Sequence, residues 1–345
     1  MSHKTQTTPS AAFVMNAGNR SFSDLVNGVQ THRLIFTAQA QVDITVAGAL
    51  LRNRGSVWAL FDEIGLDENG TDRAVLDPRV ARFFSEMFAP SQLSATRLAG
   101  VGVQAATIIR EQLMIHFSSP LSANPAETAF REHNVNAKLR AFVKLNNLAQ
   151  GGLARLSGGA PTGTITNVTC TVQQVYDSRT PQRPKYIPTY RQQVPPVGSA
   201  STDHREDIKT TKYIRAMVIQ TDSDAGETGD VIKNLEIRGD FRQIIGPGKV
   251  SWDDLLRAME AEYGGAVYVT GTGLGQSAYL GLHFQKGGRL SNILNPADDV
   301  NLRLVMDDQP SANTGAANAK VRIALCELEK DPQLTQSQDE DNVPA

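Results

Sequence analysis

A strict alternation of apolar and polar residues along one segment is the feature that most limits how this chain can fold. From Leu34 to Val46 every even position is apolar, whereas Ile35 is the only large apolar residue at an odd position. The apolar residues at the even positions are Leu34, Phe36, Ala38, Ala40, Val42, Ile44 and Val46. Because successive side chains of a strand point to opposite faces, this pattern predicts a long strand with one face on a core.

Other segments with strand character lie between turn-rich stretches, so the chain is predicted to be mostly β. Val168, Cys170 and Val172 alternate with polar neighbours in the same way as the long segment. The shorter predicted strands are Val57–Leu66, Ile108–Phe117, Leu139–Leu145, Tyr213–Gln220, Val231–Ile237, Ala266–Thr270, Ala278–Phe284, Leu302–Met306 and Val321–Leu328.

Two segments have apolar residues at helical spacing instead, each about three turns long. Asp77 is the expected N-cap of the first helix, with Pro78 at its first position, and Ser251 is the expected N-cap of the second. The two apolar faces consist of Val80, Phe83, Phe84, Met87 and Phe88, and of Trp252, Leu255, Leu256, Met259 and Tyr263.

The surroundings of these two helices are similar, which indicates an internal repeat. Ile64 lies 19 residues before Phe83, and Leu235 lies 20 residues before Leu255. The matched segments are Phe83-Phe84-x-x-Met87 with Leu255-Leu256-x-x-Met259, Ile115-His116-Phe117 with Leu282-His283-Phe284, Asn124-Pro125-Ala126 with Asn295-Pro296-Ala297, and Lys138-Leu139-Arg140 with Asn301-Leu302-Arg303. A period of about 165–170 residues is too long for a solenoid or propeller and implies two copies of a whole β domain. The alternative is that two unrelated β domains with one helix each share this pattern.

The length of 345 residues fits two domains at about 150 residues each. A β domain of that size, with about eight strands and one helix in a connection, fits a jelly roll. The predicted fold is therefore all-β: two tandem eight-stranded jelly rolls, each with one short helix in a connection. The predicted divisions are an N-terminal arm (1–30), a first roll (31–152), a second roll (153–330) and a disordered acidic tail (331–345).

Several segments are similar to the double jelly-roll major capsid proteins of icosahedral viruses of the tectivirus, corticovirus and adenovirus lineage. The stretch AYLGLHFQKGGRLSNILNPADDVNLRLVMDD (Ala278–Asp308) and the following Ala319–Lys330 resemble the closing strands of the second roll. Val57–Gly70 and Tyr213–Asp240 resemble the central strands of the two rolls. The resemblance spans about residues 30 to 330 and is one of pattern, since no short motif is diagnostic for this family.

This resemblance implies a viral major capsid protein without enzymatic activity. It implies a homotrimer with a pseudo-hexagonal outline that tiles an icosahedral shell in the virion, after synthesis in the host cytoplasm. The implied partners are other copies of the chain, minor capsid and vertex proteins, and an internal viral membrane, with no specific nucleic acid. In such proteins the N-terminal segment commonly lies at the base and the loops at the outer tip.

Three irregular segments are candidate assembly elements. Arg179–Asp207 holds five prolines and is predicted to be a long irregular excursion, either an interface or tower loop or a mobile surface loop. The glycine-rich turn Gly271–Gly275 is a second candidate loop. Ser21–Val29 is either a short helix at the base or an ordinary lead-in to the first strand.

No catalytic, cofactor-binding or metal-binding residues are predicted. Gly158–Gly163 lacks the Gly-Lys-Ser/Thr ending of a P-loop, and the six histidines form no close ligand pair. His116 and His283 are predicted to be strand histidines, and Cys170 and Cys326 small strand residues. Asp222–Asp230 begins like a calcium loop but has Lys233 where an EF-hand needs Glu, so a solvated acidic hairpin is the default and calcium the alternative.

Charge and hydropathy exclude further classes of protein. A net charge of −2 provides no basic field for nucleic acid, and neither a secretory signal nor a membrane helix is predicted. Two rival functions remain: another virion or tail β protein, and a carbohydrate-binding β-sandwich enzyme. The matched helices argue against the first, and an aromatic content of 6% with only two tryptophans argues against the second.

Overall fold

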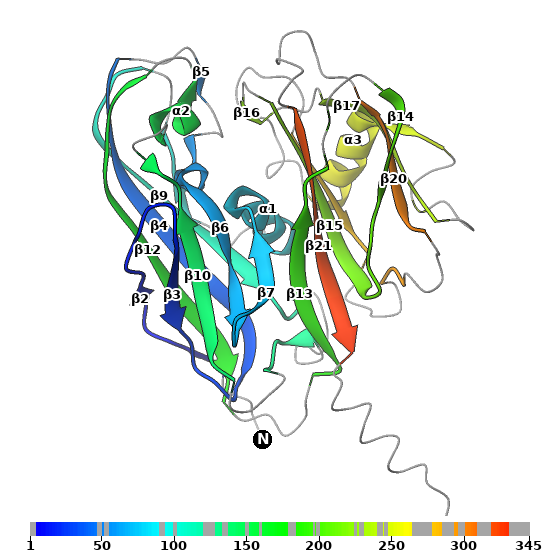
Figure 1. The fold of residues 1–345 in the computed structure, drawn as a ribbon, viewed down its shortest axis with the longest axis horizontal. Coiled ribbons are helices and arrows are strands. Elements are labelled where there is room, and N and C mark those ends of the chain that lie inside the picture. Colours follow the sequence, from blue (N-terminus) through cyan, green and yellow to red (C-terminus); the bar gives the residue numbers. More distant parts are fainter. Residues whose placement is uncertain are drawn as a thin grey trace, which may run out of the picture.

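In the computed structural model the chain forms two β-sandwiches that lie side by side (Figure 1). The structure describes residues 5–46, 50–51, 55–89, 94–98, 102–119, 128–132, 137–148, 152–158, 161–178, 184–195, 197, 201–223, 226–227, 231–239, 244, 248–263, 278–284, 293–295, 301–308 and 319–330. Among these residues, none of the helices is both long and apolar enough to cross a bilayer.

The first sandwich, roll 1, consists of two facing sheets. Sheet 1a has the order β1-β12-β4-β9, extended by β8 and with β2 also paired to β12, and sheet 1b has the order β3-β10-β6-β7. The strands are β1 (Thr5–Thr7), β2 (Ala11–Ala12), β3 (Arg20–Asp24), β4 (Gln30–Val46), β6 (Phe61–Glu68), β7 (Thr71–Leu76), β8 (Ala95–Thr96), β9 (Gln104–His116), β10 (Leu139–Leu145) and β12 (Thr162–Asp177). The short pair β5 (Leu50–Leu51) and β11 (Ser157–Gly158) and the helices α1 (Pro78–Phe88) and α2 (Gly152–Leu156) complete it.

The second sandwich, roll 2, repeats this arrangement strand for strand. Sheet 2a has the order β13-β21-β15-β19, with β16 also paired to β15, and sheet 2b has the order β14-β20-β17-β18. The elements are β13 (Tyr186–Gln193), β14 (Ser201–Asp207), β15 (Tyr213–Ser223), β16 (Gly226–Glu227), β17 (Ile232–Arg238), β18 (Val250–Ser251), α3 (Trp252–Tyr263), β19 (Tyr279–His283), β20 (Arg303–Asp308) and β21 (Lys320–Lys330). In roll 1 the last strand, β12, pairs with both β1 and β4, and helix α1 follows β7. In roll 2 the last strand, β21, pairs with both β13 and β15, and helix α3 follows β18. This arrangement is jelly-roll topology.

The predicted repeat is confirmed by this correspondence. Ile64 and Leu235 lie on the equivalent strands β6 and β17, and His116 and His283 lie on the equivalent strands β9 and β19. Leu139 begins β10, and Leu302 immediately precedes the equivalent β20. Of the matched Asn-Pro-Ala segments, only Asn295 falls within the described residues.

The alternation from Leu34 to Val46, which predicted the long strand β4, also predicts which of its side chains face the core. The even positions of β4 from Leu34 to Ile44 are all fully buried, and they face the core between sheets 1a and 1b. Val46 is 53% exposed because it lies at the end of the strand, beyond the covering sheet.

Two sequence predictions of local structure are wrong, and one pair of alternatives is decided. Arg179–Asp207 is not wholly irregular, because it contains β13 and β14. Pro188 is tolerated inside β13 because this strand pairs with β21 on one side and touches β7 on the other only at Tyr190. Val57–Leu60 forms a 3₁₀ turn capped by Ser56 rather than the start of a strand. Of the two alternatives for Ser21–Val29, the helix is not found, and the segment contributes to β3, which pairs with β10.

The strand pairing favours a later boundary between the rolls than residue 152. β12 lies beyond that position, yet it pairs with β4 along most of its length, and the corresponding last strand of roll 2 is β21. Residues 5–7, 11–12 and 20–24, within the predicted arm 1–30, likewise pair with strands of roll 1. We therefore infer a boundary between Asp177 and Tyr186. The acidic tail 331–345, the strand Ala266–Thr270 and the turn Gly271–Gly275 lie outside the described residues.

Close contact of β6 with β7 depends on a glycine. A Cβ atom on Gly65 would lie 1.8 Å from the carbonyl oxygen of Ala74 and 2.6 Å from the ring of Phe142. The oxygen belongs to the backbone of the paired strand, so it cannot move without breaking the β6–β7 pairing.

Substitution of Gly65→Ala is expected to lower the free energy of unfolding by about 3 kcal/mol through overpacking. Denaturant titration measures this change. The matched control is Gly102→Ala, where a Cβ atom meets nothing within 4 Å and should leave stability nearly unchanged. Equal effects of the two substitutions would contradict this account of β6.

Candidate functional site: the junction of the two rolls

Helix α1 is the element that joins the rolls, and it is covered on both sides. It belongs to roll 1 by sequence but lies between the two sandwiches, in contact with β9 of roll 1 and with β15 and β19 of roll 2 (Figure 1). Asp77 caps it as predicted, accepting a hydrogen bond of 2.9 Å from the backbone N–H of Arg79. All its residues are buried except Arg79 and Glu86, which are half-buried. One sheet could not cover a helix that is apolar on two sides, so its burial requires both rolls.

The surface that receives α1 in roll 2 is built from small residues. On Gly281 of β19, a Cβ atom would lie 2.9 Å from both Met87 Sδ and the Phe83 ring. Val218 is the register partner of Gly281 and of Ala324, so small side chains continue along this row of sheet 2a. Phe83 stacks on Tyr279 with ring centroids 5.0 Å apart.

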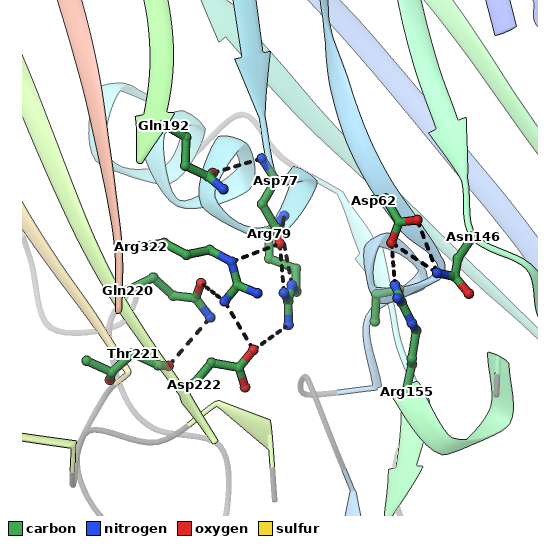
Figure 2. Close-up of polar contacts among 11 residues, drawn as sticks. Asp62, Asp77, Arg79, Asn146, Arg155, Gln192, Gln220, Thr221, Asp222 and Arg322 are labelled. Carbon is green, nitrogen blue, oxygen red and sulfur yellow. Dashed lines mark hydrogen bonds and ion pairs between the residues drawn. The ribbon is translucent and has the colours of Figure 1, made fainter. Parts of the chain in front are cut away.

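A cluster of alternating charges, the Asp77 cluster, fixes the N-terminal end of α1 to roll 2 (Figure 2). Arg79 contacts Asp77 at 2.7 Å and Asp222 at 3.6 Å. Arg322 contacts Asp222 at 3.1 Å and Asp77 at 3.6 Å, so two carboxylates and two guanidinium groups neutralise one another. The backbone N–H of Asp77 also donates to the side-chain oxygen of Gln192 at 3.0 Å.

The electrostatics of this cluster favour the ionised form of Asp77. Burial alone would raise the pKa of Asp77, but Arg79 and Arg322 outweigh it and lower this pKa to about 2. Asp77 therefore stays charged at neutral and mildly acidic pH.

A second cluster, the His116 cluster, lies at the C-terminal end of α1. Arg215 of β15 is fully buried and donates to the carbonyl oxygens of Phe117 at 2.8 Å and His116 at 3.0 Å. Its guanidinium group lies 4.6 Å from the centre of the Phe88 ring, and Tyr190 donates a hydrogen bond to the His116 carbonyl. Roll 2 thus contributes a buried cation that binds backbone groups of roll 1.

The imidazole of His116 is held neutral by this environment. Burial, and then the nearby charges of Arg33 and Arg215, lower the pKa of His116 to about 3. The Phe88 ring packs edge-on against both His116 and His283, with centroid distances of 6.0 and 5.1 Å. Both predicted strand histidines are buried, at 2% and 3% exposure.

The remaining residues considered from sequence form no reactive centre in the described part of the chain. Cys170 and Cys326 are free and buried, and burial raises the pKa of both thiols. Asp222 of the calcium-loop candidate forms ion pairs with Arg322 and Arg79. Asp224 and Asp230 of the same candidate lie outside the described residues, and Lys233 lies in β17. Among described residues, no group of three His, Cys, Asp or Glu side chains is arranged to hold a metal ion.

The sequence singles out Asp77, Phe83 and His116, but nothing in it predicts that they join the rolls. Arg79, Arg215 and Arg322 are not predicted as site residues. Arg215 carried a signal, because it is a charged residue inside the otherwise apolar run Tyr213–Ile219. Arg79, Asp222 and Arg322 gave no such signal, because the sequence does not distinguish charged residues that form buried ion pairs from those that form surface ion pairs. A separate cluster of Arg155, Asp62 and Asn146 stays within roll 1, where it ties α2 to the start of β6 (Figure 2).

Solved structures of viral capsid proteins share this fold over nearly the whole chain. The crystal structure of the STIV MCP matches with a TM-score of 0.70 at 14% identity, over 97% of this chain and 99% of that one. The PBCV-1 virus capsid matches with a TM-score of 0.59 at 11% identity, over 95% and 94%. The major capsid protein P2 from bacteriophage PM2 matches with a TM-score of 0.57 at 10% identity, over 95% and 98%.

These likenesses concern the fold. No family model matches the sequence, and no curated protein matches it significantly. The chain therefore has the double jelly-roll fold of the viral major capsid proteins, and the fold predicted from sequence is confirmed.

Removal of the central carboxylate, Asp77→Ala, is expected to cost about 3–5 kcal/mol of unfolding free energy, because it leaves Arg79 and Arg322 as unbalanced buried charges. The folded-state pKa of Asp77 lies below the value of about 3.9 expected in the unfolded chain. Its stabilisation is therefore present above pH 4 and is lost as the pH falls from about 4 toward 2. Chemical denaturation across this range measures both effects. Asp72→Ala is the control, since Asp72 forms an exposed pair with Arg20 and should cost about 1 kcal/mol or less.

His116 makes the fold sensitive to mild acid. Its folded-state pKa of about 3 lies below the unfolded value of about 6.5, so the unfolded chain binds the extra proton between these limits. Stability should fall with decreasing pH by up to about 1.4 kcal/mol per unit from this residue. In His116→Gln, denaturation midpoints should depend less on pH from about 6.5 to 3 and run parallel to the parent above that range. An unchanged slope would contradict a neutral buried His116.

Proposed function

We propose that this chain is the major capsid protein of an icosahedral virus. In this proposal three copies form a capsomer with a pseudo-hexagonal outline. The observation that carries the proposal is the strand-for-strand equivalence of rolls 1 and 2, because two similar units per chain become six similar units in a trimer. Full-length likeness to capsid proteins of three different viruses supports it.

The rigidity of the junction supports the same function. Six units around a ring can close only if the two units within each chain keep a fixed spacing and angle. The buried helix α1 and the Asp77 and His116 clusters hold the rolls at both ends of their contact. A flexible link between the rolls would not define the geometry of a tile.

The remaining partners follow from this role. The chain is located in the virion after synthesis in the host cytoplasm, and it binds other copies of itself, minor capsid proteins and vertex proteins. The base of the capsomer contacts an internal viral membrane. A net charge of −2 suits a shell of many identical subunits, because a large charge of one sign would cause strong repulsion between them. The protein performs no catalysis.

Light scattering after size exclusion should give a mass of about 112 kDa, three times the 37.4 kDa of one chain. Electron microscopy of the same fraction should show particles with a hexagonal outline and threefold symmetry. A protein that stays monomeric at all concentrations and ionic strengths, and forms no larger assemblies, would overturn the proposal.

A further inference from the structure

We propose that the outer face of sheet 1a binds roll 2 of a second copy, with α3 of that copy covering it as α1 covers sheet 2a. The central part of this outer face consists of Thr37, Gln39, Arg110, Gln112, Thr169 and Thr171, and Arg33, Ile35, Gln41 and Ile108 continue it on either side. The inference rests on the proposed assembly of copies, and it names the surface and the residues through which they meet.

The two equivalent sheets differ in whether this face is covered. In sheet 2a the face toward α1 is buried, with Tyr279 at 4% and His283 at 3% exposure. In sheet 1a, Arg110 and Thr169 are exposed, and Thr37, Gln39 and Gln112 are half-buried. The outer face of sheet 2a is therefore covered by α1 of the same chain, whereas the equivalent face of sheet 1a is left open to solvent.

The composition of the open face suits a protein partner. Its six central residues are threonines and glutamines apart from Arg110, which is the single charged side chain among them. Short uncharged polar groups cost less to desolvate than lysine or glutamate, and charged residues are depleted at the centres of protein interfaces.

The register of the strands maps one sheet onto the other. Arg33 pairs with His116 in sheet 1a, and Ala216 pairs with the matched His283 in sheet 2a. Six residues further along these strands lie Gln39 and Asp222. Asp222 is the residue that Arg79 of α1 contacts, so the equivalent contact on the open face falls at Gln39, whose partner across the sheet is Arg110.

The helix that would make this contact carries the complementary charge. Matching Phe83 with Leu255 places Ser251, the residue just before α3, opposite Arg79, and Asp253 is the first charged residue of the helical turn that follows. Asp253 and Arg110 are both exposed, and neither forms an ion pair with another described residue. Within the chain the helix contributes the positive charge, Arg79, and the sheet contributes the negative charge, Asp222. Between copies the helix would contribute the negative charge, Asp253, and the sheet the positive charge, Arg110.

The sheet edges allow the same arrangement. Within the chain, β7 at the edge of sheet 1b meets β13 at the edge of sheet 2a in parallel orientation. The equivalent strands for a contact between copies are β18 and β1, and each of them ends its sheet in the described part of the chain. Repeating the junction between copies therefore uses edges that carry no other strand in the described structure.

A charge-reversal cycle tests the inference. Arg110→Glu and Asp253→Arg should each weaken association about tenfold per interface, because each places like charges together, and the double variant should recover most of the loss. Sedimentation velocity over a dilution series at low salt measures the association. Lys138→Glu is the matched control, since Lys138 is exposed near β10 of sheet 1b and should leave association unchanged. Asp253→Asn separates the pairing from the effect of charge on the helix end, and should weaken association less than Asp253→Arg.

Proximity is tested independently of charge by Arg110→Cys with Asp253→Cys and a short bismaleimide reagent, because both native cysteines are buried. Cross-linked dimers and trimers are expected. If the parent chain does not associate, the proposed function fails. If the parent associates but the single reversals associate equally tightly, or the double variant shows no recovery, or no cross-link forms, then the capsomer uses a different face and this inference is overturned.

Discussion

Helix α1 is buried between a sheet of roll 1 and a sheet of roll 2, and this packing holds the two rolls together. On the roll 1 side, the Ser85 hydroxyl accepts the backbone N–H of Met114 in β9 at 2.7 Å. On the roll 2 side, Phe83 and Met87 occupy the space above Gly281, which no residue with a Cβ atom could provide without displacing them. Since neither sheet alone covers the helix, each roll completes the core of the other, and the chain is expected to behave as one cooperative unit.

Polar groups set the geometry that apolar packing leaves open. Apolar contacts around α1 are non-directional and would tolerate small rotations of one roll against the other. The Asp77 cluster at one end of α1 and Arg215 at the other require defined distances and angles. Buried charges of this kind add little net stability once desolvation is counted. Their contribution here is to the angle between the rolls, which the tiling of a shell requires.

Much of the fold was predictable because it depends on local periodicity. The alternation in β4, the cap Asp77 with Pro78, and the matched helices are all patterns that one strand or helix imposes on its own sequence. The error at Arg179–Asp207 has a physical cause, since β13 and β14 are strands made by pairing with distant segments. Proline-rich or polar segments of this kind show no period of their own. At the junction, Arg79, Asp222 and Arg322 come from three elements that only the folded chain brings together.

From its sequence the chain is recognisable as one built from strands, with two short helices that cover them and a pattern that occurs twice. These properties follow from side-chain periodicity, which is read along the chain without knowledge of its partners. Folding in three dimensions places the first helix between the rolls, leaves Asp253 and Asp254 of the second helix exposed, and covers the outer face of sheet 2a while that of sheet 1a stays open. Those properties depend on which surfaces meet, and contact between residues more than a hundred positions apart leaves no periodic trace in the sequence.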